Sequence, residues 1–284
     1  MSIDSKDQGE KVERRGMRER LLNTETHDAF GGLKTAIERS KQGLGTAVFC
    51  SHNFKNDMLA TLVMLKNVPE FKNKEFVLPM NSMWYKIYWP GEKLLGASFI
   101  PVHSPEVRRK NALVRKEPGS RDLTILDKIT VPRDAFPDVE PSLQRYLAAS
   151  KKVLERGGIV IVAPQAQGNM DKMDLTHQRR TFSKFRQYMS AYQLGDYSIL
   201  PIGVSYPRLA RMGLSQKGSH VGEPMRIEIG KCYSSPEAAT AIRDSGGNAD
   251  LWIYSQIASL LPSETVMYGS SPDVRVGLSR DGAV

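Results

Sequence analysis

The chain has 284 residues, of which 40% are hydrophobic and 25% are charged, and its formal net charge is +9. This length allows one large domain or two small ones, with room for a substantial core. No apolar run approaches the ~20 residues that a membrane-spanning helix needs, and the polar, charged start of the chain is not typical of a secretory signal.

The positive charge favours anionic partners: phosphorylated metabolites, acidic lipid surfaces, an acidic carrier protein or nucleic acid. The basic residues gather over 108–110, 115–116 and 179–186, a pattern that is also typical of an ordinary solvated face. The two cysteines, Cys50 and Cys232, lie far apart, and each is beside a strand-like apolar run. We therefore expect buried, reduced thiols and a cytoplasmic location.

Hydrophobic periodicity and the positions of Gly and Pro divide the chain into elements. We expect a disordered or loosely helical arm over 1–26, a folded domain over 27–262 and a flexible tail over 263–284. The elements expected in the first half of the domain are, in chain order, a helix over 27–42, a strand over 46–50, a helix over 54–66, and strands over 75–79 and 96–102.

The second half of the domain opens with residues 103–135, which are rich in charge, Pro and Gly and are expected to run over the surface. The elements expected after them are a helix over 140–156, a strand over 159–164, a loop over 165–178, a helix over 182–194, strands over 198–206 and 225–229, and a helix over 249–261. Because strands and helices alternate, we expect an α/β fold: a single domain with a mainly parallel or mixed central sheet flanked by helices, and a helical N-terminal lead-in.

His52 and Asp57 are five positions apart and directly follow the first expected strand. In one uniform helix, five residues rotate by roughly 500°, so the two side chains would diverge by about 140°. They can face each other only if the chain turns between them, and a strand that ends near Cys50 with a helix that starts near Asn53 supplies that turn. A carboxylate beside an imidazole fixes its tautomer and stabilises its charged form. The other interpretation of this spacing is a capped helix with a surface His.

The order of four segments resembles the glycerolipid acyltransferase superfamily, whose members acylate glycerol phosphate and lysophosphatidic acid. The resemblance covers about residues 45 to 235. Its motifs are His-x4-Asp after an apolar strand, G-x-x-F-I-x-R, a strand that runs into F-P-E-G-T-R, and an apolar strand with a central Pro. The residues that match or stand at these motifs are His52 and Asp57 in the first, Gly96, Phe99 and Ile100 in the second, Pro164, Gln165 and Gly168 in the third, and Pro201 in the fourth.

Two motifs depart from the family pattern. Val102 stands at the position of the family's phosphate-binding Arg, for which Arg108 or Arg109 could substitute, and Gln165 stands at the position of the Glu. A neutral amide in place of a carboxylate should change which acceptor hydroxyl is recognised. The sequence therefore leaves open the acceptor, the acyl chain length and the carrier.

The resemblance implies direct acyl transfer from an acyl thioester, either acyl-CoA or acyl-carrier protein, to a hydroxyl of a glycerolipid-like or phosphorylated acceptor. His52 would be the general base and Asp57 would orient it. No metal, no other cofactor and no nucleic acid are implied, and the protein would act peripherally at the cytoplasmic face of a membrane, on an anionic lipid or phosphorylated acceptor. The residues implied to bind substrate are Gly96, Phe99, Arg108, Arg109, Pro164, Gln165, Gly168 and Pro201.

Other classes of function remain as alternatives. A non-catalytic lipid- or membrane-binding protein could keep the same fold, whereas a nucleic-acid-binding protein is suggested by charge alone. A serine hydrolase is disfavoured because no G-x-S-x-G occurs, and nucleotide-binding and zinc motifs are missing as well. The aromatic residues over 84–89 suit an acyl tunnel, a membrane interface or helix packing equally, and His103 and His177 are expected to be surface histidines.

Overall fold

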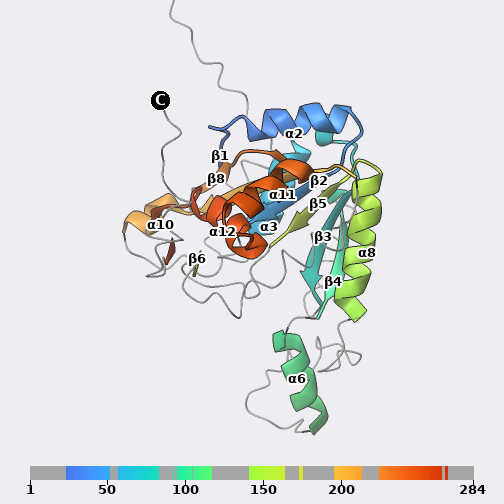
Figure 1. Cartoon of the computed structure of the whole chain (residues 1–284). Coiled ribbons are helices and arrows are strands. Elements are labelled where there is room, and N and C mark those ends of the chain that lie inside the picture. Colours follow the sequence, from blue (N-terminus) through green and yellow to red (C-terminus); the bar gives the residue numbers. More distant parts are fainter. Residues whose placement is uncertain are drawn as a thin grey trace, which may run out of the picture.

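One central β-sheet with helices on both faces organises the computed structural model of this chain (Figure 1). This arrangement confirms the expected α/β class. The expected helix over 182–194, the aromatic residues over 84–89 and the lead-in before residue 24 lie outside the described part. The residues that the structure describes are 24–51, 57–82, 92, 95–103, 105–116, 141–163, 173–174, 195–212, 224–263 and 266–267.

The central sheet is mixed but mainly parallel. Its strand order is β1-β8-β7-β2-β5-β3-β4, with β9 paired to β7. Strands β2, β3, β4, β5 and β7 run in one direction, β8 and β9 are antiparallel to β7, and β1 is parallel to β8. The bounds are β1 Thr24–His27, β2 Thr46–Cys50, β3 Phe76–Asn81, β4 Ser98–Val102, β5 Ile159–Val162, β7 Ser198–Ser205, β8 Met225–Ile229 and β9 Tyr233–Ser234. A separate two-stranded parallel sheet pairs β6, Met173–Asp174, with β10, Val266–Met267.

The centre of the sheet is formed by the most apolar segments of the chain. Every residue of β2, β5 and β7 is buried. Continuous apolar runs of this kind are typical of parallel strands that are covered on both faces. The strands expected over 46–50, 159–164 and 198–206 are therefore confirmed within a few residues.

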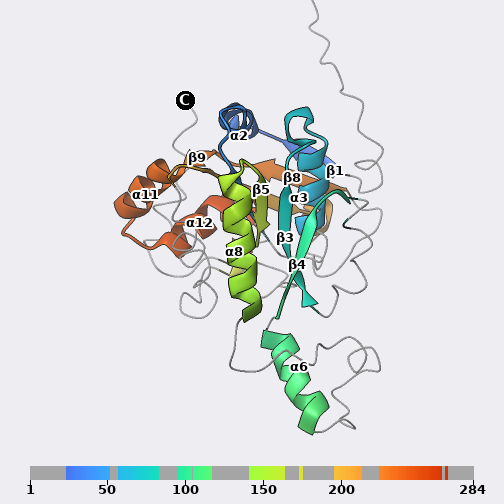
Figure 2. The same cartoon turned by 90° about the vertical axis from the view of Figure 1, so that its right-hand side faces the viewer.

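Helices cover the two faces of the sheet (Figures 1 and 2). One face packs against α2, α3 and the short helix η1, and the other face packs against α8, α11 and α12. Alternate strand residues point to each side, so the fold has two hydrophobic layers. The bounds are α2 Gly32–Lys41, α3 Asp57–Lys66, η1 Pro69–Phe71, α8 Pro141–Glu155, α10 Pro207–Arg211, α11 Ser235–Asp244 and α12 Ala249–Ala258.

Several elements differ from the sequence-based expectations. β1 pairs with β8, so the sheet already includes residues 24–26, which we had expected in the N-terminal arm. Its sequence, Thr-Glu-Thr-His, has no apolar alternation that could have indicated a strand. Helix α6, Pro105–Lys116, lies within the expected surface excursion and extends away from the sheet in both views. Strand β10 lies beyond the expected end of the domain at residue 262.

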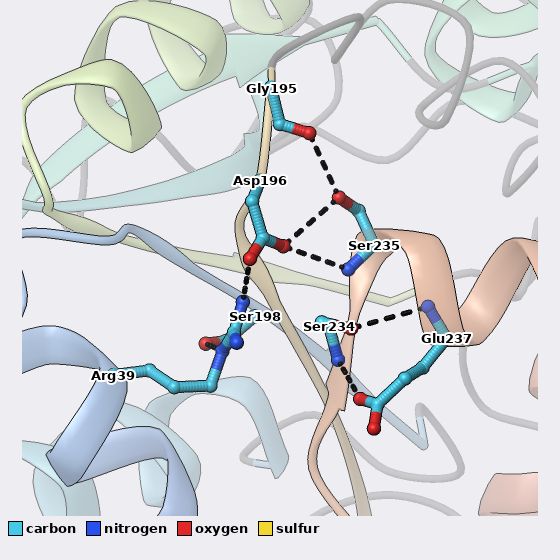
Figure 3. A network of polar contacts seen from close by, with 7 residues as sticks. All are labelled: Arg39, Gly195, Asp196, Ser198, Ser234, Ser235 and Glu237. Atoms are coloured by element: carbon cyan, nitrogen blue, oxygen red, sulfur yellow. Dashed lines mark hydrogen bonds and ion pairs between the residues drawn. The ribbon is translucent and has the colours of Figure 1, made fainter.

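A polar network joins three elements at the end of the sheet where β7 begins (Figure 3). The Arg39 side chain of α2 donates from Nη2 to Asp196 Oδ2 at 2.7 Å and from Nε to Ser198 Oγ at 2.9 Å. Asp196 Oδ1 accepts from the backbone N–H and the hydroxyl of Ser235, both at 3.3 Å. Burial would raise the pKa of Asp196, but the hydrogen bond and charge of Arg39, with the bonds from Ser235, lower it below its usual range.

Candidate active site

The carboxyl ends of five parallel strands meet at one edge of the sheet, which we call the carboxyl edge. The chain leaves β2 through α3 toward β3, and it leaves β7 through α10 toward β8 on the other side. Neighbouring strands whose connections depart in opposite directions form a topological switch point, where open α/β sheets bind their ligands. The junction of β2 and β7 is such a point, and His52 follows the end of β2 in the sequence.

Ser51 fixes the end of β2 against β7. Its backbone N–H donates to the carbonyl of Ile202 at 3.0 Å. Its hydroxyl oxygen accepts from the backbone N–H of Val204 at 2.9 Å, and the hydroxyl lies 3.3 Å from the Val204 carbonyl, to which it donates. Ser51 is fully buried. The residue before His52 is therefore held by backbone and side-chain bonds to the neighbouring strand.

Asp57 lies in the first turn of α3 and is 0% exposed. Its Oδ1 accepts from the backbone N–H of Met58 at 2.8 Å, and its backbone carbonyl accepts from the Thr61 hydroxyl at 2.9 Å. The positive end of the helix dipole stabilises a negative charge at this place. The structure thus holds a buried carboxylate at the start of the helix that follows β2.

Cys50 links this carboxylate to the end of β2. The negative charge of Asp57 and the side chain of Thr61 both act on the Cys50 thiol. Burial raises the pKa of the Cys50 thiol well above its usual range, and Asp57 raises it further. The thiol is therefore neutral and unreactive at neutral pH, as expected for a buried, reduced cysteine.

The structure describes the strand before the predicted turn between His52 and Asp57 and the helix after it. The strand ends at Cys50 and the first turn of the helix contains Asp57, as the spacing argument required. Residues 52–56, which include His52 and the expected N-cap Asn53, lie outside the described residues. The position of the imidazole therefore stays a prediction.

Three of the expected substrate-binding residues lie away from Asp57. Phe99 is buried on β4, which β5 and β3 separate from β2. Pro201 pairs with Phe49 in the register of β7 and β2, so the two side chains are on the same face of the sheet. Phe49 belongs to the core layer under α8, α11 and α12, on the other face of the sheet from α3 and Asp57. Gly96 precedes β4, and a Cβ there would lie 3.4 Å from Lys66 Nζ, at the far end of α3. Lys66 is nine residues from Asp57, or roughly 14 Å along the helix.

The remaining expected residues are only partly described. Arg109 is exposed on α6, and the side chain of Arg108 lies outside the described part, as do Pro164, Gln165 and Gly168. Helix α6 begins just after β4, so it leaves from the carboxyl edge. β5 ends at the same edge and pairs with β2, so Val162, the last residue of β5, lies opposite Phe49.

His103, expected on the surface, is buried. Its Nδ1 lies 2.8 Å from the Ser82 hydroxyl oxygen, and the two residues are 8% and 4% exposed. Ser82 follows β3 and His103 follows β4, so both stand at the carboxyl edge. The basic residues near His103 in the sequence suggested exposure, but the strand that precedes it places it within the fold. His177 lies outside the described part.

The described ranges contain no group of three or more His, Cys, Asp or Glu residues placed to hold a metal ion. They also contain no helix that is both long and apolar enough to cross a bilayer. No protein-family model matches the chain, and a comparison with curated proteins found no match. The interpretation of this site consequently depends on its residues and their geometry.

Proposed function

We propose that the protein is an acyltransferase that moves a fatty acyl group from an acyl thioester to a hydroxyl of a glycerolipid-like or phosphorylated acceptor. The observation that carries the proposal is the buried Asp57 in the first turn of α3, next to the end of β2 and five residues after His52. The site lies at the switch point of the sheet, where α/β enzymes bind their substrates. The order of motifs that resembles the glycerolipid acyltransferases supports the same assignment.

In the proposed reaction, His52 removes the proton of the acceptor hydroxyl, and the oxygen attacks the thioester carbonyl. The tetrahedral intermediate collapses as the C–S bond breaks, and the leaving thiolate takes the proton back from His52. Asp57 orients the imidazole and stabilises its positive charge between these two proton transfers. A buried carboxylate suits this role, because its interaction with a cation is weakly screened by water.

The proposal is tested by measuring thiol release from acyl-CoA and acyl-carrier protein, with lysophospholipids, glycerol phosphate and polar-lipid extracts as acceptors. We expect acceptor-dependent release by the wild type. A loss of roughly 10²–10⁴ in kcat is expected for His52→Ala, because this is the usual contribution of a general base. Asp57→Asn should also lower kcat strongly, because an amide cannot stabilise the imidazolium.

Two matched variants control for general effects of these substitutions. His27 is exposed on β1 and Asp244 is exposed at the end of α11, so His27→Ala and Asp244→Asn should retain the wild-type rate. No release with any acceptor by a folded protein would contradict the proposal. If that protein still bound lipid vesicles, a non-catalytic lipid-binding role would replace it.

A further inference from the structure

The Ser82–His103 pair is a second polar site that the proposed transfer reaction does not use. The hydroxyl and the imidazole are 2.8 Å apart, which is a good hydrogen-bond distance for this pair. In the tautomer that carries its proton on Nε2, Nδ1 accepts from the Ser82 hydroxyl. A serine hydroxyl that donates to an imidazole is the basic arrangement of an activated nucleophile.

The pair lies directly after two neighbouring parallel strands, at the carboxyl edge. Ser82 directly follows β3. His103 follows β4, which is paired with β3 so that Asn81 lies opposite Val102. The pair continues this register by one residue at the carboxyl edge. β5 alone separates β3 from β2, so the pair and the end of β2 are two strand spacings apart, or roughly 10 Å.

Burial gives the pair a second property that this chemistry needs. Both residues are less than a tenth exposed, and Phe99 and Leu78 of the same two strands belong to the core layer beside them. A site with little water strengthens the interaction between the imidazole and the charge that develops in the reaction.

We propose that Ser82 and His103 form a nucleophile–base pair that accepts acyl groups from activated esters and thioesters. Ser82 Oγ attacks the acyl carbonyl while its proton passes to His103 Nδ1. The C–S or C–O bond to the leaving group then breaks, and the leaving group takes the proton from His103. A water molecule, deprotonated by His103, attacks the acyl-serine ester, and the proton returns to Oγ as this ester breaks. The net reaction is hydrolysis, and it requires neither His52 nor Asp57.

The experiment is covalent labelling of the full-length protein with a fluorophosphonate, whose P–F bond is displaced by an activated serine oxygen. Peptide mass spectrometry would locate the adduct, and p-nitrophenyl butyrate would report hydrolysis. We expect one phosphonyl group on Ser82 and none there in Ser82→Ala. His103→Gln should label roughly 100-fold more slowly or worse, in keeping with the usual contribution of a general base.

Three further variants make the result specific. Ser150 is a buried serine on α8, so labelling in Ser150→Ala should match the wild type. His52→Ala should also label normally, which separates this proposal from the acyltransferase proposal. If His103→Gln fails to fold, Ser82→Cys replaces it, and its new thiol should react with iodoacetamide faster than the buried Cys50 and Cys232. Any one of three results would show that the pair is only a structural hydrogen bond. These are no adduct on Ser82 in the folded wild type, a labelling rate in a folded His103→Gln equal to that of the wild type, and an unreactive thiol in Ser82→Cys.

Discussion

At the scale of single residues, the candidate site depends on how firmly its neighbours are held. Ser51 bonds to β7 through its backbone and its hydroxyl, and the Thr61 hydroxyl bonds to the backbone of Asp57. These contacts hold the end of β2 against β7 and stabilise the first turn of α3, the two elements on either side of the segment that contains His52. A dyad on two separate elements needs such anchors, because a displacement of about 1 Å can cost roughly 10² in rate.

Replacing Ser51 by alanine should therefore affect stability as well as activity. The substitution leaves the buried N–H of Val204 without its acceptor, which costs about 1–3 kcal/mol. Urea denaturation at pH 7 would measure the loss, and the thiol-release assay would measure the fall in rate. Ser245→Ala is the control, because that hydroxyl bonds to Ile242 O at an exposed position and its loss should cost less than about 0.5 kcal/mol. Equal stability of the two variants would contradict the anchoring role of Ser51.

The residues also mark the limit of what the sequence could predict at the site. The spacing of His52 and Asp57 after an apolar strand predicted a strand, a turn and a helix, and the structure has the strand and the helix. The burial of His103 and its bond to Ser82 could not be predicted, because the partners are 21 residues apart and meet only through strand pairing. The order of the motifs grouped Gly96 with the site. Gly96 precedes β4, however, so it lies toward the end of the sheet opposite to the carboxyl edge.

At the scale of elements, the Arg39–Asp196 pair fixes α2 against the start of β7, and Ser235 adds the start of α11. The pKa of Asp196 is lowered in the folded protein, so its contribution to stability is complete above its unfolded pKa of about 3.9 and is lost as the pH falls through the folded pKa. Asp196→Asn should be less stable than the wild type at pH 7, and this difference should shrink as the pH falls below about 3.9. The side chain of Asp196 is 37% exposed, so solvent screening limits the difference to about 1 kcal/mol or less.

Thermal unfolding of both proteins between pH 3 and pH 7 would check this prediction. Asp244→Asn, at an exposed position on α11, controls for the loss of one negative charge. A difference between Asp196→Asn and the wild type that stays constant down to pH 3 would show that the carboxylate charge is not the source of the effect.

The contact between β7 and α12 offers a second test at this scale. A Cβ on Gly203 would lie 2.7 Å from Leu260 Cβ and 3.0 Å from Leu260 O, so the strand and the turn that follows α12 approach too closely for a side chain. Gly203→Ala should lower the free energy of unfolding by about 1–3 kcal/mol. Gly195→Ala is the matched control, because no atom lies within 4 Å of its added Cβ. Chemical denaturation would compare them, and equal stability would mean that α12 can move away at little cost.

The elements that were not expected from the sequence differ in how clearly their local sequence indicates a helix or a strand. Helix α11 has a capping box, in which the Ser234 hydroxyl accepts from the Glu237 N–H and the Glu237 carboxylate accepts from the Ser234 N–H. The Ser-x-x-Glu pattern was therefore available, and apolar periodicity alone was too weak to find this helix. Helix α6 lay in a segment whose charge, Pro and Gly content suggested a loop. Strand β1 has no local signal, because its pairing with β8 joins residues about 200 positions apart.

At the scale of the whole molecule, the net charge of +9 and the position of α6 bear on the proposed membrane contact. Arg109, Arg115 and Lys116 are exposed on this helix, whereas Val107 is buried. Helix α6 extends from the carboxyl edge, on which Asp57 lies (Figures 1 and 2). We therefore expect attraction to anionic lipid by charge, with little insertion of apolar side chains from this helix. Each well-placed Lys or Arg contributes about 1 kcal/mol to such attraction.

Reversing Arg109, Arg115 and Lys116 to Glu should weaken binding to vesicles of acidic phospholipid by at least roughly 100-fold, since the loss of three cations alone costs about 3 kcal/mol, which corresponds to that factor. Cosedimentation at low salt would measure it, and the wild type should also release the vesicles as salt rises, because the Debye length falls to ~10 Å at 0.1 M. The control reverses Arg145, Lys152 and Arg243, which are exposed on α8 and α11 and change the net charge equally. Equal losses in both triple variants would show that total charge governs binding. A loss confined to the α6 variant would orient the carboxyl edge toward the lipid, where a membrane-bound acceptor could reach Asp57.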